Sequence, residues 1–375
     1  MFITIVVLVL MIGYLTYIVL EKIYINKIRK SFKYLIHVNG IRGKSTTTRL
    51  IDAGFRACGY KVFSKTTGTK PMYINTNNED VLIKRLGNAN IREQIQMMRR
   101  AYKEGAEVLI LECMAVKPEL QKLSEEMILR SDCTVITNVR ADHLDEMGST
   151  LEDIAYSFSN TIPNKGILVC GEDKFLNIFE ENAKKKDAKV LLASEYDGDN
   201  LETFKENIAC ALEVAKAFNL DVNKFFEGMK NYHHDIGAYE KIKYDNTIFL
   251  NGFSINDPES IRIVYNQVIE EYDYNSLTIL LNSRFDRPSR VVQHIELLSN
   301  LKAKKILIYG SNPNYIIKRL KKNGISIEVN RLHKIEDLNH EDIIFAIGNI
   351  GGKGMKILEY FRRNGEKLWQ LISMC

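Results

Sequence analysis

Two glycines, a lysine and a hydroxyl side chain lie within six positions in the sequence Gly40-Ile-Arg-Gly-Lys-Ser45. Glycines let backbone N–H groups approach an anion closely, and a helix N-terminus adds a partial positive charge. A lysine here can reach the outer phosphates of a nucleotide, and the serine hydroxyl can bind Mg²⁺. The full Walker pattern needs a glycine where this chain has Val38, so only a shorter loop is present. A helix-capping turn is the alternative. The predicted nucleotide contacts are Asn39, Gly40, Ile41, Arg42, Gly43, Lys44, Ser45 and Thr46.

Two further polar groups follow short apolar runs. Glu112 ends the run Glu107–Leu111, and His143 follows the run Cys133–Asn138. In open α/β sheets the ligand lies beyond the carboxyl ends of the strands, so we expect both side chains near the loop. A carboxylate can bind Mg²⁺ or orient a water molecule on it, although a solvated charge is the alternative. Histidine is not the usual ligand for Mg²⁺, and a structural histidine between two aspartates is its alternative.

Apolar runs and helical patterns alternate along residues 34–218, which predicts a parallel sheet covered on both faces. The predicted strands are Tyr34–Asn39, Glu107–Leu111, Cys133–Asn138, Gly166–Cys170 and Val190–Ala193. The predicted helices are Lys44–Cys58, Ile91–Glu104 and Leu201–Phe218. We predict a phosphate-loop central domain over residues 34–238.

A second, smaller α/β block of the Rossmann-like kind is predicted over residues 239–375. Its predicted strands are Thr247–Leu250, Leu277–Leu281, Lys305–Tyr309, Ile325–Val329 and Ile343–Ile347. Helices are expected at Pro258–Tyr272 and Arg290–Leu301. The boundary between the two blocks is expected within residues 236–243.

The chain opens with an uncharged apolar stretch of nineteen residues, Phe2–Leu20. As a helix it would be about 28 Å long, close to the thickness of a bilayer core. No basic residue precedes it, and Leu20-Glu-Lys-Ile23 is not a cleavage site, which disfavours a signal peptide. We predict a transmembrane anchor over residues 1–21 and a basic juxtamembrane segment over 22–33. The positive-inside rule then places the body in the cytoplasm.

The composition is that of an ordinary globular protein, with 45% hydrophobic and 26% charged residues. It excludes a disordered chain, a fibre and a multi-span membrane protein. The net charge is +5, but residues 1–33 hold five basic residues against one acidic residue, which leaves the body at +1. A nearly neutral body argues against nucleic acid as a partner.

Several motifs, taken together, resemble the Mur ligase superfamily, and within it the membrane-anchored ligase subunits of poly-γ-glutamate synthases. They include the phosphate loop, the strand-end glutamate and the Asp-His pair. The more specific stretches are Leu111-Glu-Cys-Met-Ala-Val-Lys-Pro-Glu-Leu120, Asn251-Gly-Phe-Ser-Ile-Asn-Asp-Pro-Glu-Ser260 and Leu281-Asn-Ser-Arg-Phe-Asp-Arg-Pro288. The resemblance runs from the anchor to near the C-terminus.

The resemblance implies roles for individual residues. Lys44 would act on phosphate, and Ser45, Glu112 and His143 would hold magnesium; Lys44, Glu112 and His143 are the expected catalytic residues. Further residues are implied near the nucleotide: Asn207, Arg284, Asp286 and Arg287. Weaker substrate or nucleotide candidates are Asn138, Asn251, Asn256 and Asp257; asparagine and aspartate are common in turns.

The chain departs from the family pattern in two places. Many Mur ligases carry a carbamylated lysine about fifteen residues after the Asp-His pair, but this chain has no lysine there before Lys165. The substrate domain that precedes the central domain in cell-wall ligases is replaced by the apolar segment, which argues against a nucleotide-linked substrate.

The resemblance implies an ATP-dependent amide ligase that polymerises glutamate into poly-γ-glutamate through an acyl phosphate, with release of ADP and phosphate. The implied cofactor is Mg²⁺, with Mn²⁺ as a substitute. The implied partners are glutamate, the growing polymer, the membrane and other subunits of a synthesis and export complex; a homo-oligomer is compatible with these features. The alternatives are another Mur-type γ-glutamyl ligase and a membrane-tethered P-loop ATPase that supports transport.

Overall fold

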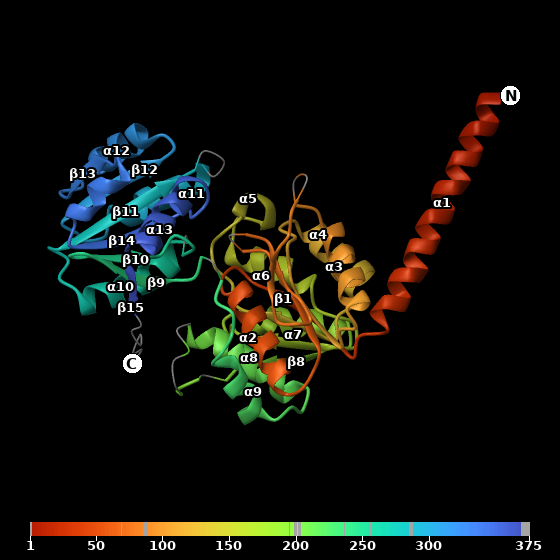
Figure 1. The fold of residues 1–375 in the computed structure, drawn as a ribbon. Coiled ribbons are helices and arrows are strands. Elements are labelled where there is room, and N and C mark those ends of the chain that lie inside the picture. The colour runs from red at the N-terminus through yellow and green to blue at the C-terminus, as the bar shows by residue number, and fades with distance from the viewer. Residues whose placement is uncertain are drawn as a thin grey trace. The chain divides into compact units, whose positions relative to one another are not determined.

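The computed structural model describes residues 2–68, 70–85, 87, 89–194, 196–198, 201, 204–235, 237–255, 257–284 and 288–368. The chain divides into two compact units, residues 1–234 and 235–375, which are described separately (Figure 1). The sequence placed the division between residues 238 and 239, four residues later.

The first element is one long helix, α1 (Phe2–Arg29), which Figure 1 shows in red. Its residues from Phe2 to Leu20 are exposed and apolar. The helix does not stop at residue 21, where the sequence placed the end of the anchor. It continues because Ile25 and Ile28, three positions apart, share one face and are buried against the rest of the unit.

Unit 1 is built on an eight-stranded sheet in the order β4-β3-β2-β5-β1-β6-β7-β8. The strands from β2 to β8 in this order run parallel, and the short strands β3 and β4 are antiparallel at one edge. The strand bounds are β1 Tyr34–Asn39, β2 Val62–Thr66, β3 Met72–Ile74, β4 Asp80–Leu82, β5 Val108–Glu112, β6 Cys133–Ile136, β7 Ile167–Cys170 and β8 Lys189–Leu192.

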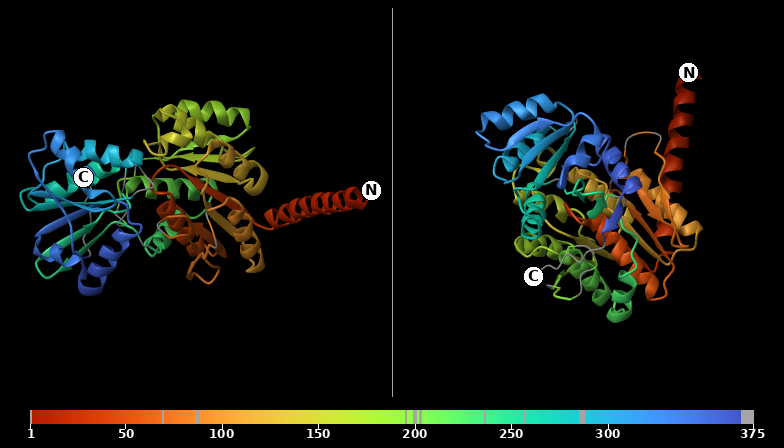
Figure 2. Two further views of the ribbon diagram at one scale, coloured as in Figure 1. Left: turned by 90° about the horizontal axis from the view of Figure 1, so that it is seen from above. Right: turned by 60° about the vertical axis from the view of Figure 1, so that its left-hand side comes forward.

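Helices cover both faces of this sheet, as the three views together show (Figures 1 and 2). The α-helices are α2 Lys44–Ala57, α3 Arg92–Lys103, α4 Pro118–Leu123, α5 Leu144–Met147, α6 Leu151–Ser159, α7 Leu176–Lys185, α8 Lys205–Ala217 and α9 Val222–Met229. A π-helical turn, η1, spans Ser124–Leu129.

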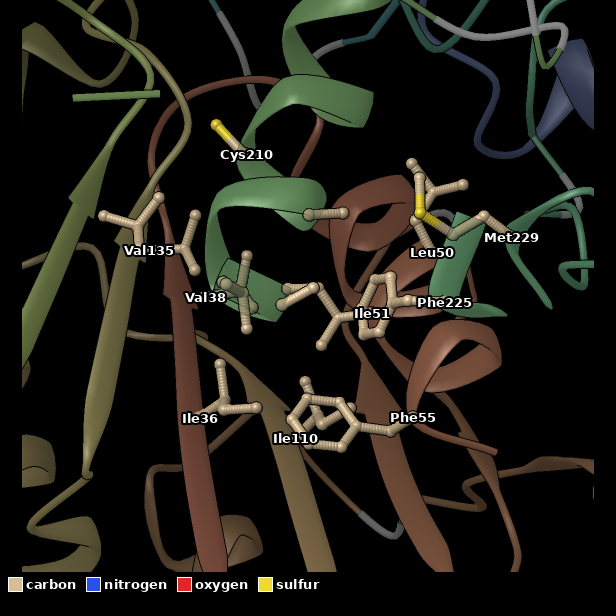
Figure 3. Packing of buried hydrophobic residues seen from close by; sticks show 14 of the residues in the cluster. Ile36, Val38, Leu50, Ile51, Phe55, Ile110, Val135, Cys210, Phe225 and Met229 are labelled. Atoms are coloured by element: carbon tan, nitrogen blue, oxygen red, sulfur yellow. The ribbon is translucent and has the colours of Figure 1, made fainter. Parts of the chain in front are cut away.

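Alternate residues of the central strand point to different cores, as the pleat of a strand requires. Ile36 and Val38 of β1 pack against α2, α8 and α9, and Figure 3 shows Val38 near Ile51 of α2. Leu35 packs on the other face with the end of α1, α3 and η1. The phosphate loop therefore follows a strand that is fixed on both sides.

Unit 2 has a seven-stranded sheet in the order β13-β12-β11-β14-β10-β9-β15, parallel from β13 to β10 and antiparallel at β9 and β15. Its strands are β9 Glu240–Tyr244, β10 Thr247–Asn251, β11 Leu277–Ser283, β12 Lys305–Gly310, β13 Glu328–Arg331, β14 Ile343–Gly348 and β15 Glu366–Leu368. Its helices are α10 Pro258–Glu271, α11 Pro288–Leu298, α12 Pro313–Lys322, the 3₁₀ turn η2 Ile335–His340 and α13 Lys353–Asn364.

The predicted α/β class of both units is confirmed. The prediction did not contain the antiparallel edge strands, because three-residue strands such as β3, β4 and β15 are too short to show a period of two. The strand expected at Ile325–Val329 begins three residues later, at Glu328.

Candidate active site

The phosphate loop joins the end of β1 to α2 through two glycines with positive φ, Gly40 at 124° and Gly43 at 81°. A Cβ atom on Gly40 would lie 2.1 Å from Thr137 Oγ1, and one on Gly43 would lie 2.0 Å from Asn207 Oδ1. Neither position can hold a larger residue without displacing its neighbours. The loop is thus tight enough to present backbone N–H groups at the start of α2.

Lys44, the first residue of α2, folds back across the loop. Its Nζ donates to the carbonyls of Gly40 at 2.7 Å and Ile41 at 3.1 Å. The side chain keeps some exposed surface but is densely surrounded, and this burial lowers the pKa of the ammonium, with Glu112 acting in the opposite direction. The lysine is held over the loop by backbone carbonyls rather than by an ion pair.

A hydroxyl and a carboxylate meet beside the loop. Ser45 Oγ donates to Glu112 Oε2 at 2.7 Å, and Glu112 is 2% exposed. They can meet because β5, which ends at Glu112, pairs directly with β1. Hydroxyl and carboxylate oxygens are suited to Mg²⁺, which takes oxygen ligands and commonly keeps waters and substrate phosphates in its shell. Among the residues that the structure describes, no three His, Cys, Asp or Glu side chains gather as a protein-only metal site.

Thr67 is a member of this cluster that the sequence did not reveal. Its backbone N–H donates to Glu112 Oε2 at 2.7 Å, and its Oγ1 bonds the other carboxylate oxygen. Gln94 of α3 supports the same residue, since its Nε2 donates to the Glu112 carbonyl at 3.1 Å. The available signal was the threonine-rich turn that follows β2, a strand that also pairs with β5.

The segment that follows β6 packs against the loop. Asn138 Oδ1 accepts the Arg42 N–H at 3.0 Å, and Thr137 Oγ1 donates to the Arg42 carbonyl at 2.6 Å. The Arg42 guanidinium in turn pairs with Asp142 at 3.0 Å. Asn138 therefore shapes the phosphate loop, and the Asp-His pair is joined to the loop tip through Arg42.

His143 stands at the N-terminus of α5 with a left-handed backbone, φ 55°. Its ring nitrogens lie 3.9 Å from the carboxylates of Asp142 and Glu146. Two carboxylates thus stand close to the ring of His143. Its predicted magnesium role stays a prediction.

The other predicted residues of unit 1 support the loop. Asn39 is buried, with its Nδ2 bonded to Gln121 and Thr161 at 3.2 Å each and its Oδ1 accepting the Gly40 N–H. Asn207, buried on α8, accepts from Thr47 Oγ1 at 3.3 Å. Two residues complete the loop region, the buried Ile41 and the half-buried Thr46.

The predicted residues of unit 2 are spread over several strand ends. Asn251 ends β10 and donates to the Ala238 carbonyl at 3.0 Å. Asp257 caps α10 by accepting the Ser260 N–H at 2.9 Å, and its predicted substrate or nucleotide role stays a prediction. Arg284 is exposed and lies 3.5 Å from Asn349 Oδ1. Three predicted residues lie outside the described part of the chain: Asn256, Asp286 and Arg287.

A second glycine-bearing turn joins β14 to α13 in the sequence Gly348-Asn-Ile-Gly-Gly-Lys353, and the sequence prediction did not single it out. Gly348 and Gly352 have positive φ, 99° and 66°, and Lys353 begins the helix with an exposed side chain. Asn282, at the end of the neighbouring strand β11, bonds the Asn349 carbonyl through its Nδ2. A helix N-terminus, glycines and a lysine form a candidate anion site.

Comparison with known proteins agrees with both units. The model of the Mur ligase middle domain matches residues 38–240, and that of the poly-γ-glutamate synthase CapB C-terminal domain matches residues 236–364. The PGA synthase CapB of Bacillus subtilis is 33% identical over 90% of this chain and 92% of its own. The capsule biosynthesis protein CapB of Bacillus anthracis is 32% identical over 86% of this chain and 75% of its own.

The chain belongs to the Mur ligase family, in its CapB branch. It is therefore an ATP-dependent amide ligase, and the resemblance inferred from its motifs is confirmed.

Solved structures show the Mur ligase fold over almost the whole chain. The folylpolyglutamate synthase of Mycobacterium tuberculosis, complexed with ADP and AMPPCP, superimposes with a TM-score of 0.70 at 15% identity, covering 94% of this chain and 96% of that one. The bifunctional folylpolyglutamate synthase/dihydrofolate synthase with Mn, AMPPNP and L-glutamate bound gives 0.67 at 14% identity, covering 90% and 92%.

Proposed function

We propose that this Mur ligase polymerises glutamate into poly-γ-glutamate, with ATP and Mg²⁺ or Mn²⁺, at the cytoplasmic side of a membrane. The observation that carries the substrate assignment is the likeness to PGA synthase CapB over nine-tenths of the chain. The Ser45–Glu112 pair at the end of the phosphate loop supports the use of a nucleotide with a divalent cation.

The reaction needs activation because a carboxylate oxygen is a poor leaving group. The γ-carboxylate of the chain end or of glutamate attacks the terminal phosphorus of ATP, which forms an acyl phosphate and releases ADP. The α-amine of another glutamate then attacks the carbonyl carbon and loses a proton, the new C–N bond forms, and phosphate leaves. Both steps gather negative charge, so catalysis depends on positioned positive groups.

In unit 1 those groups are the loop N–H donors and Lys44. Ser45, Glu112 and His143 are the residues that would hold Mg²⁺. Thr67 would orient the carboxylate of Glu112. When bound, the metal neutralises phosphate charge. Burial of Glu112 and its bonds to Thr67 keep the carboxylate fixed, which limits reorganisation during the reaction.

In unit 2 the turn Gly348–Lys353 is the proposed site for a carboxylate of glutamate. The support is the positive end of α13 together with the exposed Lys353 ammonium. The turn offers amides and a lysine, and Gly354 stands where the first turn has the Ser45 hydroxyl. That chemistry favours an organic anion over a metal-bound phosphate.

The membrane assignment is supported by α1, the one helix in the described part of the chain that is long and apolar enough to cross a bilayer. The basic residues that follow Leu20 favour a cytoplasmic body. A product made beside a membrane can be passed to membrane subunits that export it, and we propose such subunits as partners.

The test is glutamate-dependent ADP release by the full-length protein in membranes, with the product analysed for γ-linkage and length. Polymer formation with ADP release is the expected result. Release without glutamate would instead indicate a P-loop ATPase, and addition of a single glutamate to a small acceptor would indicate another γ-glutamyl ligase. Lys44→Ala is the inactive reference, and Lys224→Ala, an exposed lysine of α9, is its matched control.

A further inference from the structure

The base of α1 is held to unit 1 by a charged cluster directly below the apolar stretch. Glu21 accepts bonds from Arg92 at 2.8 and 2.9 Å and from Arg99 at 3.0 Å, both on α3. Tyr17 Oη donates to the same carboxylate at 3.2 Å, and the Arg99 guanidinium lies 5.6 Å from the centre of the Tyr24 ring. One carboxylate thus joins α1 to two turns of α3.

The next two turns of α1 belong to the core of the unit. Ile25 and Ile28 are buried in one cluster with Met97 and Met98 of α3. On the other side, Arg29 pairs with Asp132 at 2.7 Å and donates to the Leu129 and Arg130 carbonyls at 2.9 Å each. The helix therefore enters the unit as a packed element and not as a flexible tether.

These contacts fix the position of α3 along the axis of α1. Arg92 and Arg99 are seven positions apart, and both reach Glu21, so the middle of α3 lies level with that residue. Glu21 follows Leu20 at a rise of about 1.5 Å. If residues 2–20 span a bilayer, the middle of α3 lies at the height of the lipid headgroups.

We propose that the exposed side of α3 and the adjoining side of α1 rest on an anionic bilayer surface and hold unit 1 in one orientation. This anchor-base surface consists of Lys22, Tyr24, Arg92, Gln96 and Arg99. The inference rests on the proposed membrane span of residues 2–20.

The chemistry of the anchor-base surface suits headgroups of anionic lipids. Lys22 is an exposed cation, and the exposed Arg92 shares the Glu21 carboxylate with Arg99, so two arginines stand against this one carboxylate. Tyr17 and Tyr24 flank Glu21 where tyrosines are enriched at membrane interfaces. Cations close to an anionic membrane surface are attracted to it.

The experiment places a fluorescent reporter on either face of the sheet of unit 1. The single native tryptophan, Trp369, is replaced by phenylalanine, and a tryptophan is introduced by Gln96→Trp in one variant and Asn223→Trp in another. Gln96 is exposed on the Arg92–Arg99 side of α3. Asn223 is exposed on α9, which packs on the opposite face of the sheet.

Each full-length variant is placed in phosphatidylcholine/phosphatidylglycerol nanodiscs that contain a lipid with a nitroxide on its headgroup. Most of the Gln96→Trp emission should be quenched, and the Asn223→Trp emission should stay unquenched. In the same discs, Glu21→Gln combined with Gln96→Trp should reduce the quenching. Equal quenching at the two positions would overturn the proposal.

Extraction with alkaline carbonate distinguishes the membrane span of residues 2–20 from the fixed orientation of unit 1. A protein that stays in the bilayer while Gln96→Trp is unquenched retains its anchor and overturns only the fixed orientation. A protein that washes out overturns the membrane span and this inference together. Unchanged binding of an ATP analogue shows that each variant is folded.

Discussion

Both units contain a glycine-bearing turn that leads from the end of a parallel strand into a helix beginning with lysine. In unit 1 the turn follows β1, and in unit 2 it follows β14. Beside Lys44 stand the Ser45 hydroxyl and the buried Glu112 carboxylate. Lys353 is followed by Gly354, and in the turn before it Asn282 Nδ2 donates to the Asn349 carbonyl and Asn349 Oδ1 accepts the Gly351 N–H.

The two turns thus share a backbone arrangement but differ in the side chains around them. A hydroxyl and a carboxylate next to a lysine suit a phosphate that brings a divalent cation. Amides next to a lysine suit an anion without a metal, such as the carboxylate of an amino acid. We propose that each glycine turn binds an anion and that the residues around the turn select which anion.

The largest expected effect comes from Lys44→Ala. This change removes the positive charge next to the transferred phosphoryl group, and glutamate-dependent ADP release should fall at least about 100-fold. The fold should persist, because the Lys44 ammonium donates to the loop carbonyls of Gly40 and Ile41 and, within the described residues, not to a distant part of the unit. Near-normal turnover by a folded Lys44→Ala protein would show that the first turn is not the ATP site.

Glu112→Gln and Ser45→Ala test the metal side of the first turn. Each should lower turnover by about 10- to 100-fold, and the double variant should be little worse than either, because the two groups act as one unit. A rise in the Mg²⁺ concentration needed for half-maximal activity is the specific readout. Unchanged metal dependence with additive losses would show that the pair serves only the fold.

His143→Ala tests whether His143 acts together with Ser45 and Glu112 in binding the metal. Its loss should lower turnover to a similar extent, with partial recovery at high Mn²⁺ concentration. A variant with normal turnover and a modestly lower melting temperature would make His143 a structural cap of α5.

Lys353→Ala tests the second turn. The KM for glutamate should rise about 10-fold, the scale for losing one charged hydrogen bond, while binding of ADP stays unchanged. Lys356→Ala, an exposed lysine three positions along the same helix, is the matched control. A weaker affinity for ADP in place of glutamate would assign a nucleotide role to this turn.

The last expected effect is on stability and not on activity, and it concerns His37, which lies on the strand below the first turn. His37 of β1 is buried and lies 2.9 Å from Glu125 Oε2. Burial alone would lower the pKa of His37, but the Cys113 sulfur and the Glu125 carboxylate outweigh it and raise the pKa to about 9.

A raised folded pKa adds stability that is fully present below the unfolded value of about 6.5 and is lost as the pH rises through about 9. The unfolding free energy of unit 1 should therefore fall over this range, by at most about 3 kcal/mol. Denaturant titrations at several pH values measure it, with Glu125→Gln as the comparison. A flat profile would mean that the pair contributes no net stability.

The sequence was most informative where one short segment contains the whole feature. The first turn follows an apolar strand and precedes a helical pattern, so its position could be predicted from residues 34–48. Glu112 was also accessible, because a charge after an apolar strand marks the edge where ligands bind.

Features that depend on contacts distant in sequence were not accessible. Thr67 reaches Glu112 only because β2 and β5 pair, and the Arg42–Asp142 bond joins residues one hundred positions apart. The turn at Gly348 lacks the hydroxyl that marks a phosphate loop, so its sequence did not distinguish it from an ordinary helix start. The continuation of α1 past Glu21 was not accessible either, because it involves arginines seventy-one and seventy-eight positions away.

The connection between α1 and β1 also has a mechanical consequence. Residues 30–33 alone separate the end of α1 from β1, and β1 is hydrogen-bonded on both sides, to β5 and to β6. Tension on α1 would therefore reach the middle of the sheet and not a peripheral strand. Once the contacts of Arg29 and Ile28 have broken, two ladders of backbone bonds would have to fail together before α1 could be pulled away. Because α1 is joined to the strand that leads into the phosphate loop, a force strong enough to detach it would also disrupt that loop.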